Sequence, residues 1–271
     1  MIRQAIIPLA GLGTRLLPLT SVFAKELLPM NGKAGIEYIL DECVDAGIKE
    51  VVFIISKNKM MIKDYFYKDS FYKNVIKKKK DKRIINEYKK ILKYKKMIKF
   101  VYQNKPLGTG DAVLKTKKFI KDKYFLMLLP DDLIIKKNCS KDMIKVHHKH
   151  KASVMASMKV NSKTVSRWGI YSLNKKISKN DYFINGVVEK PDVKKAPSNK
   201  AVIGRYILPK TIFKKLAKLK PGNGGEIHIT DAIQTLIKEG EKFIAHNFLG
   251  NYLDCGTMQG FINSNNEIGK L

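Results

Sequence analysis

The sequence predicts an α/β fold in which helices flank a mixed, mostly parallel central sheet. Three observations support this prediction. Short apolar runs rich in β-branched residues recur along the chain, helix-like segments separate the early runs, and no linker rich in Gly, Pro or Ser divides the 271 residues. Alternating strands and helices favour an open sheet that is covered on both faces. We therefore predict a single domain over residues 1–271.

The first half of the chain supplies four of the expected strands. They are apolar runs with strand-like composition, at residues 4–9, 51–56, 99–103 and 124–129. Helix-like segments lie between or after them, at residues 35–46, 110–119 and 140–150. The second half supplies further expected strands at residues 152–160, 186–189, 200–208 and 242–247.

Residues 65–99 interrupt this alternation. The segment is dense in Lys, Tyr and Ile, has neither Gly nor Pro, and contains four consecutive lysines, Lys77–Lys80. We predict one or two solvated helices inserted between strands. An RNA-binding arm is the alternative, although lysine runs are a weak signal for it.

The net charge of +29 raises the question of whether the protein binds nucleic acid. Only five of the 53 basic residues are arginine, and the lysines are spread along the whole chain. Proteins that read bases or clamp phosphates in a bidentate manner favour arginine. We therefore attribute the lysine excess to composition and expect no specific nucleic acid, while a basic nucleic-acid-binding protein remains the alternative from a different class.

The cysteine content and the hydropathy of the chain indicate its cellular compartment. Cys43, Cys139 and Cys255 are scattered, odd in number and without metal-ligand spacing. They predict reduced thiols and a cytoplasmic location. Hydrophobic residues make up 44% of the chain, as in globular proteins, and no apolar run approaches the ~20 residues of a membrane span.

A glycine turn follows the first expected strand. The stretch "AIIPLAGLGTRLLPLTSVFAKELLPM" places Gly11, Gly13, Thr14 and Arg15 after that strand, and Lys25 ten residues further on. Glycines let the backbone approach a bound group closely, and two permanent cations suit a triphosphate. Because ligands bind beyond the carboxyl ends of such strands, we predict a phosphate cradle rather than a plain turn. The dinucleotide fingerprint fails here, since its third glycine is replaced by leucine.

Paired carboxylates close another apolar run. "LLPDD" at residues 128–132 places Asp131 and Asp132 side by side, which is unfavourable without a nearby cation. Mg²⁺, held by carboxylates and substrate phosphates, is the expected occupant, and an exposed turn is the alternative. Asp254, beside the glycine of "LDCGT", is a plausible second ligand.

The stretch "GVVEKP" at residues 186–191 ends a short strand with Glu189 and Lys190 before a proline. A carboxylate can accept hydrogen bonds from sugar hydroxyls, and an ammonium group can meet a phosphate. On its own, this stretch says little.

Several motifs occur together in one order. Besides those above, they are "QNKPLGTGDA" at 103–112, "APSNKAVIGRYIL" at 196–208, "GGEIHITDAI" at 224–233 and "LDCG" at 253–256. Over about residues 3–262 the chain resembles the bacterial UTP–glucose-1-phosphate uridylyltransferases of the sugar nucleotidyltransferase superfamily. It departs from their pattern at residues 31–35 and at Thr109 and Asp111.

The resemblance implies a Rossmann-like nucleotidyltransferase fold, with a nucleotide-binding part at about 1–135 and a sugar-binding part at about 136–271. It implies transfer of uridylyl from UTP to glucose 1-phosphate, with Mg²⁺ as cofactor and a homo-oligomer, a dimer or a tetramer, as the assembly. The implied catalytic residues are Arg15 and Lys25, and the implied metal ligands are Asp131 and Asp254. The implied nucleotide-binding residues are Ala10, Gly11, Gly13, Thr14, Gln103, Gly108 and Asp131; the implied sugar- or phosphate-binding residues are Gly169, Glu189, Lys190, Gly204 and Glu226. A related transferase that uses dTTP is the nearest alternative, and an inactive descendant is another.

Overall fold

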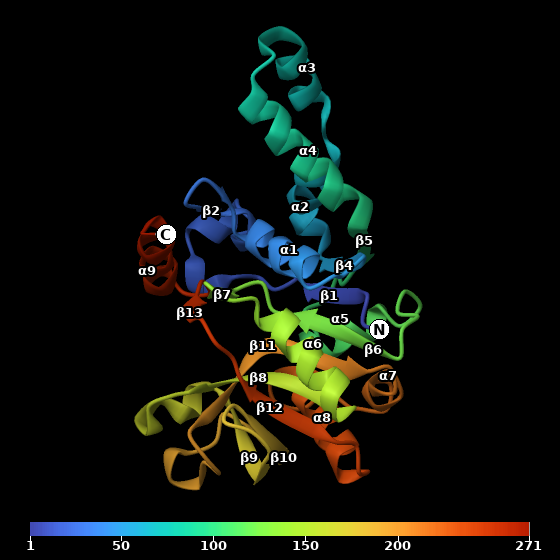
Figure 1. The fold of residues 1–271 in the computed structure, drawn as a ribbon, viewed down its shortest axis with the longest axis vertical. Coiled ribbons are helices and arrows are strands. Elements are labelled where there is room, and N and C mark those ends of the chain that lie inside the picture. Colours follow the sequence, from blue (N-terminus) through green and yellow to red (C-terminus); the bar gives the residue numbers. More distant parts are fainter. Residues whose placement is uncertain (271) are drawn as a thin grey trace.

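The computed structural model describes residues 1–270, and its centre is a nine-stranded mixed sheet (Figure 1). The strand order is β5-β4-β1-β6-β11-β8-β12-β10-β9. The sheet is mixed, as predicted. Within the described residues, no helix is both long enough and apolar enough to cross a bilayer.

The first four strands form the parallel part of this sheet. They are β1 (Gln4–Pro8), β4 (Glu50–Ile55), β5 (Ile98–Tyr102) and β6 (Tyr124–Leu128). β1 lies between β4 and β6, and all these pairings are parallel. The predicted strands are confirmed here to within a residue at each end. Because parallel strands are covered on both faces, their near-continuous apolar runs are easy to recognise.

The second half of the sheet is largely antiparallel. It contains β8 (Ser153–Lys159), β9 (Gly169–Lys176), β10 (Asp181–Glu189), β11 (Lys200–Pro209) and β12 (Phe243–Asn247). β11 pairs antiparallel with both β6 and β8, and β10 pairs antiparallel with β9 and β12. β9 was not predicted, because its last three residues are polar and exposed. β10 begins five residues before the expected strand, and this additional part includes the buried Asp181 and Ile184.

Helices cover both faces of the sheet and bury two apolar clusters. One face carries α1 (Gly35–Asp45), α2 (Met60–Tyr67), α4 (Lys82–Met97) and α6 (Cys139–His150); the other carries α5 (Gly108–Lys115), α7 (Ile212–Leu216) and α8 (Ile229–Lys238). The helix expected at 110–119 spans 108–115 instead, and residues 116–119 form turns in which the Phe119 amide donates to the Thr116 carbonyl at 2.8 Å.

Smaller elements complete the chain. β7 (Asp132–Ile135) pairs with β13 (Asn251–Asp254), β2 (Pro29–Met30) pairs with β3 (Lys33–Ala34), and α9 (Met258–Gly269) closes the chain. Single 3₁₀ turns lie at Thr14–Leu16, Leu19–Ser21, Lys25–Leu27, Lys57–Lys59, Ser162–Arg167, Val193–Lys195 and Asn223–Gly225.

The lysine-rich segment forms a helical hairpin that projects from the body of the protein (Figure 1). α3 (Ser70–Lys79) has no buried residue, and Lys77–Lys80 are all exposed, as predicted for a solvated helix. α4 differs, because its second half buries Ile91 and Tyr94 against the main core. The prediction of wholly solvated helices is therefore wrong for the base of the hairpin.

Candidate active site

A pocket of about 420 Å³ lies beyond the carboxyl ends of β1 and β6. It is the place where an open α/β sheet binds its ligands. The site residues predicted from sequence that line this pocket are Ala10, Gly11, Gly13, Thr14, Lys25, Gln103, Gly108, Asp131 and Glu226. The glycine turn, the lysine and the carboxylate are thus brought together from three separate stretches of the chain.

The glycine turn contributes open space and a tight bend. A Cβ added at Gly11 would meet nothing within 4 Å, so the backbone there is free to face a ligand. Gly13 has φ +70°, and an added Cβ would lie 3.1 Å from the Thr20 side chain. The Thr20 hydroxyl in turn donates a hydrogen bond of 2.8 Å to the Gly13 carbonyl, which fixes the bend.

Lys25 and Asp131 form the electrostatic centre of the pocket. Lys25 Nζ lies 2.6 Å from Asp131 Oδ2, and the two side chains are only 14% and 19% exposed. Arg15 Nη2 approaches the same oxygen at 3.8 Å from a more exposed position. Burial opposes ionisation of both partners, but their mutual attraction outweighs it: the pKa of Asp131 is lowered and the pKa of Lys25 is raised. Both groups are therefore charged near neutral pH.

Asp254 lies beside this pair. A Cβ added at Gly256 would lie 2.9 Å from Asp131 Oδ2, 3.2 Å from Asp254 Oδ1 and 2.9 Å from Arg15 Nη2. Gly256 thus leaves a small space toward which two carboxylate oxygens and a guanidinium converge. Within residues 1–270, no group of three or more His, Cys, Asp and Glu side chains could hold a metal ion by itself. Two carboxylates are nevertheless a donor set that fits Mg²⁺, which usually completes its shell with waters and substrate phosphates.

Asp132 has a different environment from Asp131. It accepts hydrogen bonds from the Tyr252 hydroxyl at 2.6 Å and from the Gly204 amide at 2.8 Å. Burial and the charge of Asp131 raise the pKa of Asp132 to about 6. An added Cβ at Gly204 would lie 2.5 Å from Asp132 Oδ2, so glycine is required there for packing. The alternative of an exposed turn is wrong for this pair.

Gln103 is oriented by a residue that the sequence analysis did not assign. Its amide nitrogen donates hydrogen bonds to Asp111 Oδ2 at 2.7 Å and to the Gly108 carbonyl at 3.1 Å. Gly108 has φ +91°, and an added Cβ would lie 2.7 Å from the Ile227 carbonyl. The only signal for Asp111 in the sequence was that it departs from the family pattern.

The predicted sugar-side residues are divided between two places. Gly169 and Glu189 face each other across β9 and β10, and an added Cβ at Gly169 would lie 3.1 Å from Glu189 Oε2. Lys190 follows with φ +45°, and its amide donates to the Trp168 carbonyl at 3.0 Å. None of these three lines the pocket described above, whereas Glu226 does.

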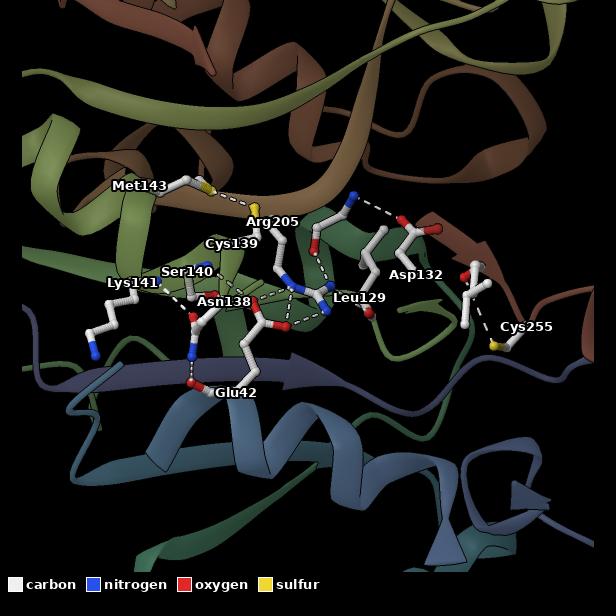
Figure 2. Close-up of polar contacts among 12 residues, drawn as sticks. Glu42, Leu129, Asp132, Asn138, Cys139, Ser140, Lys141, Met143, Arg205 and Cys255 are labelled. Carbon is white, nitrogen blue, oxygen red and sulfur yellow. Dashed lines mark hydrogen bonds and ion pairs between the residues drawn. The ribbon is translucent and has the colours of Figure 1, made fainter. Parts of the chain in front are cut away.

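Two buried ion pairs near the pocket were missed by sequence reasoning. In the first pair, Lys59 Nζ lies 2.9 Å from an oxygen of Glu26, the residue that follows Lys25 in the chain. In the second pair, Arg205 Nη2 lies 2.8 Å from Glu42 Oε2 (Figure 2). A charged residue inside the apolar run "AVIGRYIL" was the available signal for Arg205.

Comparisons with known proteins agree on one family. Residues 4–270 match the family model described as nucleotidyl transferase. The chain is 39% identical to a UTP–glucose-1-phosphate uridylyltransferase of Streptococcus pyogenes, over 96% of this chain and 86% of that protein. It is 38% identical to the enzyme of the same name from Mycoplasma pneumoniae, over 97% of this chain and 91% of that protein. A crystal structure of UDP-glucose pyrophosphorylase complexed with UDP-glucose superposes with a TM-score of 0.87 at 35% identity, covering 100% of this chain and 99% of that chain.

Proposed function

Because the chain belongs to the nucleotidyl transferase family, we propose that it is a UTP–glucose-1-phosphate uridylyltransferase, which converts UTP and glucose 1-phosphate to UDP-glucose and pyrophosphate. One observation carries the chemistry. Lys25 and Asp131 form a largely buried ion pair at the floor of a glycine-lined pocket, with Arg15 beside them. This arrangement suits a polyphosphate better than a neutral ligand.

The reaction is an in-line displacement. An oxygen of the sugar phosphate attacks the α-phosphorus of UTP, a new phosphorus–oxygen bond forms, and the bond to the β-phosphate oxygen breaks to release pyrophosphate. Two anions must approach each other, so catalysis rests on positioning and charge neutralisation. Arg15 and Lys25 hold the triphosphate and stabilise the charge that develops on the leaving pyrophosphate. No covalent nucleophile is needed; the buried thiols of Cys43, Cys139 and Cys255 have pKa values raised by burial and take no part.

Asp131 and Asp254 are the residues that would hold Mg²⁺. The ion would neutralise phosphate charge and orient the two reacting phosphates. Asp131 is also paired with Lys25 and Arg15. Those cations keep Asp131 ionised and ready to act as a ligand.

The remaining residues recognise the two substrates. The backbone at Ala10 and Gly11, together with Gln103 and Gly108, receives the uracil, and Gly13 and Thr14 face the phosphates. Glu189 accepts hydrogen bonds from glucose hydroxyls, and Lys190 meets the sugar phosphate. Gly169, Gly204 and Glu226 complete the sugar side. The exposure of Glu189 and Lys190 supports these roles, since both residues are accessible to a ligand.

A cytoplasmic location and a dimer or tetramer belong to the same proposal. Three free, buried cysteines support a reducing compartment. Light scattering after size exclusion measures the assembly, and a monomer at micromolar concentration would contradict that part.

Pyrophosphate release tests the reaction. The purified protein is incubated with Mg²⁺, glucose 1-phosphate and, in turn, ATP, GTP, CTP, UTP or dTTP. We expect release with UTP to exceed release with every other nucleotide. A preference for dTTP would favour the thymidylyl alternative, and no release with any nucleotide would contradict transferase activity.

A further inference from the structure

Arg205 combines complete burial with contacts to the turn that carries Asp131. Its side chain is 0% exposed, and it lies on β11 where the pairing with β8 shifts register between Ile203 and Tyr206. Because side chains alternate along a strand, Arg205 shares the face of Ile203 and Ile207, toward α1 and away from the apolar cluster on the other face (Figure 2). A cation in such a place requires partners for its donors.

Glu42, on α1, supplies the charge partner. Arg205 Nε lies 3.1 Å from both carboxylate oxygens of Glu42, and Nη2 lies 2.8 Å from Oε2. Glu42 is itself held, because the amide and hydroxyl of Ser140 donate to Oε1 at 3.1 and 2.5 Å. The guanidinium therefore has a fixed plane and a fixed direction.

The remaining nitrogen reaches the catalytic turn. Arg205 Nη1 donates to the Leu129 carbonyl and to the Gly204 carbonyl, each at 3.2 Å. The Leu129 amide donates to the same Gly204 carbonyl at 2.7 Å. Leu129 is followed by Pro130, whose ring restricts the backbone, and then by Asp131. A shift of the Leu129 carbonyl therefore moves Asp131 as well, because the restricted backbone at Pro130 cannot absorb it.

The other flank of Asp131 is fixed separately. The Cys255 amide donates to the Asp131 carbonyl at 2.8 Å, and Asp132 is held by Tyr252 and Gly204. Gly204 therefore serves both flanks, through its carbonyl on one side and its amide on the other. Arg205 holds the flank that precedes Asp131 through its side chain, by the contact with the Leu129 carbonyl.

We propose that Arg205, aimed by Glu42, is a positioning residue that fixes the Leu129–Asp131 turn and so sets the Asp131 carboxylate against Lys25. The role rests on the proposed transferase function. A buried ion pair can often be replaced by apolar residues with no loss of stability. The pair here has a second consequence, because it links α1 and α6 to the carboxylate on which the reaction depends. Misplacing a reacting group by about 1 Å can reduce the rate on the order of 10²-fold.

The test compares Arg205→Met and Arg205→Lys with a matched control, Asp181→Asn. Asp181 forms another buried pair, with His246 at 2.7 Å, on strands β10 and β12. For each folded variant, kcat, the KM for UTP and the melting temperature are measured. We expect Arg205→Met to lower kcat about 100-fold with the KM for UTP within about threefold, and Arg205→Lys to recover part of the loss. The control should keep kcat within about twofold despite a lower melting temperature.

The outcomes separate the two proposals. If the wild-type protein releases no pyrophosphate with any nucleotide, the transferase function fails, and with it the role of Arg205. If the wild type is active and folded Arg205→Met retains its kcat, the positioning role alone is overturned. If Arg205→Met does not fold, Glu42→Gln decides, because it keeps the side-chain shape and removes the charge that aims the guanidinium. A kcat about tenfold lower at unchanged KM supports the role, and an unchanged kcat overturns it.

Discussion

The pocket and the α3–α4 hairpin use the same residue type in opposite ways. In the pocket, Lys25 is 14% exposed and lies 2.6 Å from one carboxylate oxygen. In the hairpin, Lys77–Lys80 are exposed, and ion pairs such as Lys73 with Asp69 lie at the surface. The net charge of +29 counts these lysines equally. The comparison shows that a lysine indicates a functional site only where the side chain is buried and a charged partner fixes its orientation.

The energetic difference follows from the surroundings. Exposed ion pairs contribute about 0–1 kcal/mol and are screened by salt over ~8 Å. A largely buried pair is screened less by salt, and removal of one partner leaves the other charge buried and uncompensated. The following changes test this contrast, from the largest expected effect to the smallest.

Asp131→Asn should have the largest effect. It removes the charge that pairs with Lys25 and, in the proposed reaction, a ligand of Mg²⁺. We expect kcat to fall by on the order of 10³ while the protein stays folded. Steady-state kinetics in saturating Mg²⁺ measure it. Turnover near that of the wild type would exclude Asp131 from the reaction.

Lys25→Ala should come next. The proposed role of Lys25 is to stabilise charge that develops in the transition state, so we expect kcat to fall about 10²-fold with a smaller change in the KM for UTP. The same assay with UTP varied measures both constants. A pure rise in KM would show that Lys25 binds substrate and transition state equally.

Lys190→Ala should act on the other substrate. Its side chain is exposed and lies outside the main pocket, which fits a role in holding the sugar phosphate. We expect the KM for glucose 1-phosphate to rise about tenfold, with a loss of kcat of a few fold. Identical kinetic signatures for the two lysine variants would contradict their separate roles.

Asp132→Asn should change the pH dependence of stability. The pKa of Asp132 rises from an ordinary 3.8 to about 6 in the folded protein. Between these values the folded state binds more protons than the unfolded state, so the wild type loses stability as pH rises through this window. We expect the free energy of unfolding of the variant to improve relative to wild type, by about 1 kcal/mol between about pH 5 and about pH 8. Urea unfolding at both pH values measures this, and a difference independent of pH would contradict it.

Replacing Lys77–Lys80 with glutamine should have the smallest effect. These residues lie on the exposed end of α3, far along the projecting hairpin (Figure 1). We expect kcat and both KM values to stay within about threefold of wild type. The same variant tests the nucleic-acid alternative by filter binding at physiological salt. Tight RNA retention that these substitutions abolish would add a second function.

Sequence reasoning located the parallel half of the fold and most of the pocket. Buried parallel strands give continuous apolar runs, and three of the four runs lead into Gly11, Gln103 and Asp131, respectively. β9 was missed because it buries only Ile170 and Tyr171 and ends in three exposed polar residues, 174–176. The short pair β7 and β13 was missed because its pairing joins residues that are far apart in the chain.

Side-chain partnerships were the part that sequence could not supply. Glu42 and Arg205 are 163 residues apart, and neither has a local signal that names the other. Asp131 and Asp132 have different partners and different pKa shifts. Asp131 pairs with Lys25 and Asp132 accepts a hydrogen bond from Tyr252, and these two partners come from opposite ends of the chain. The contact of Asp111 with Gln103 spans only eight residues, but it depends on the conformation of the loop that joins β5 to α5.

Transfer of the α-phosphate of UTP into UDP-glucose tests the central claim most directly. UTP labelled with ³²P at the α-position is incubated with glucose 1-phosphate, Mg²⁺ and, in parallel, the wild type, Asp131→Asn and the Lys77–Lys80 glutamine variant. We expect labelled UDP-glucose at similar rates from the wild type and the hairpin variant, and almost none from Asp131→Asn. Label that never enters UDP-glucose with the wild type, or that enters it equally well with Asp131→Asn, would contradict the account.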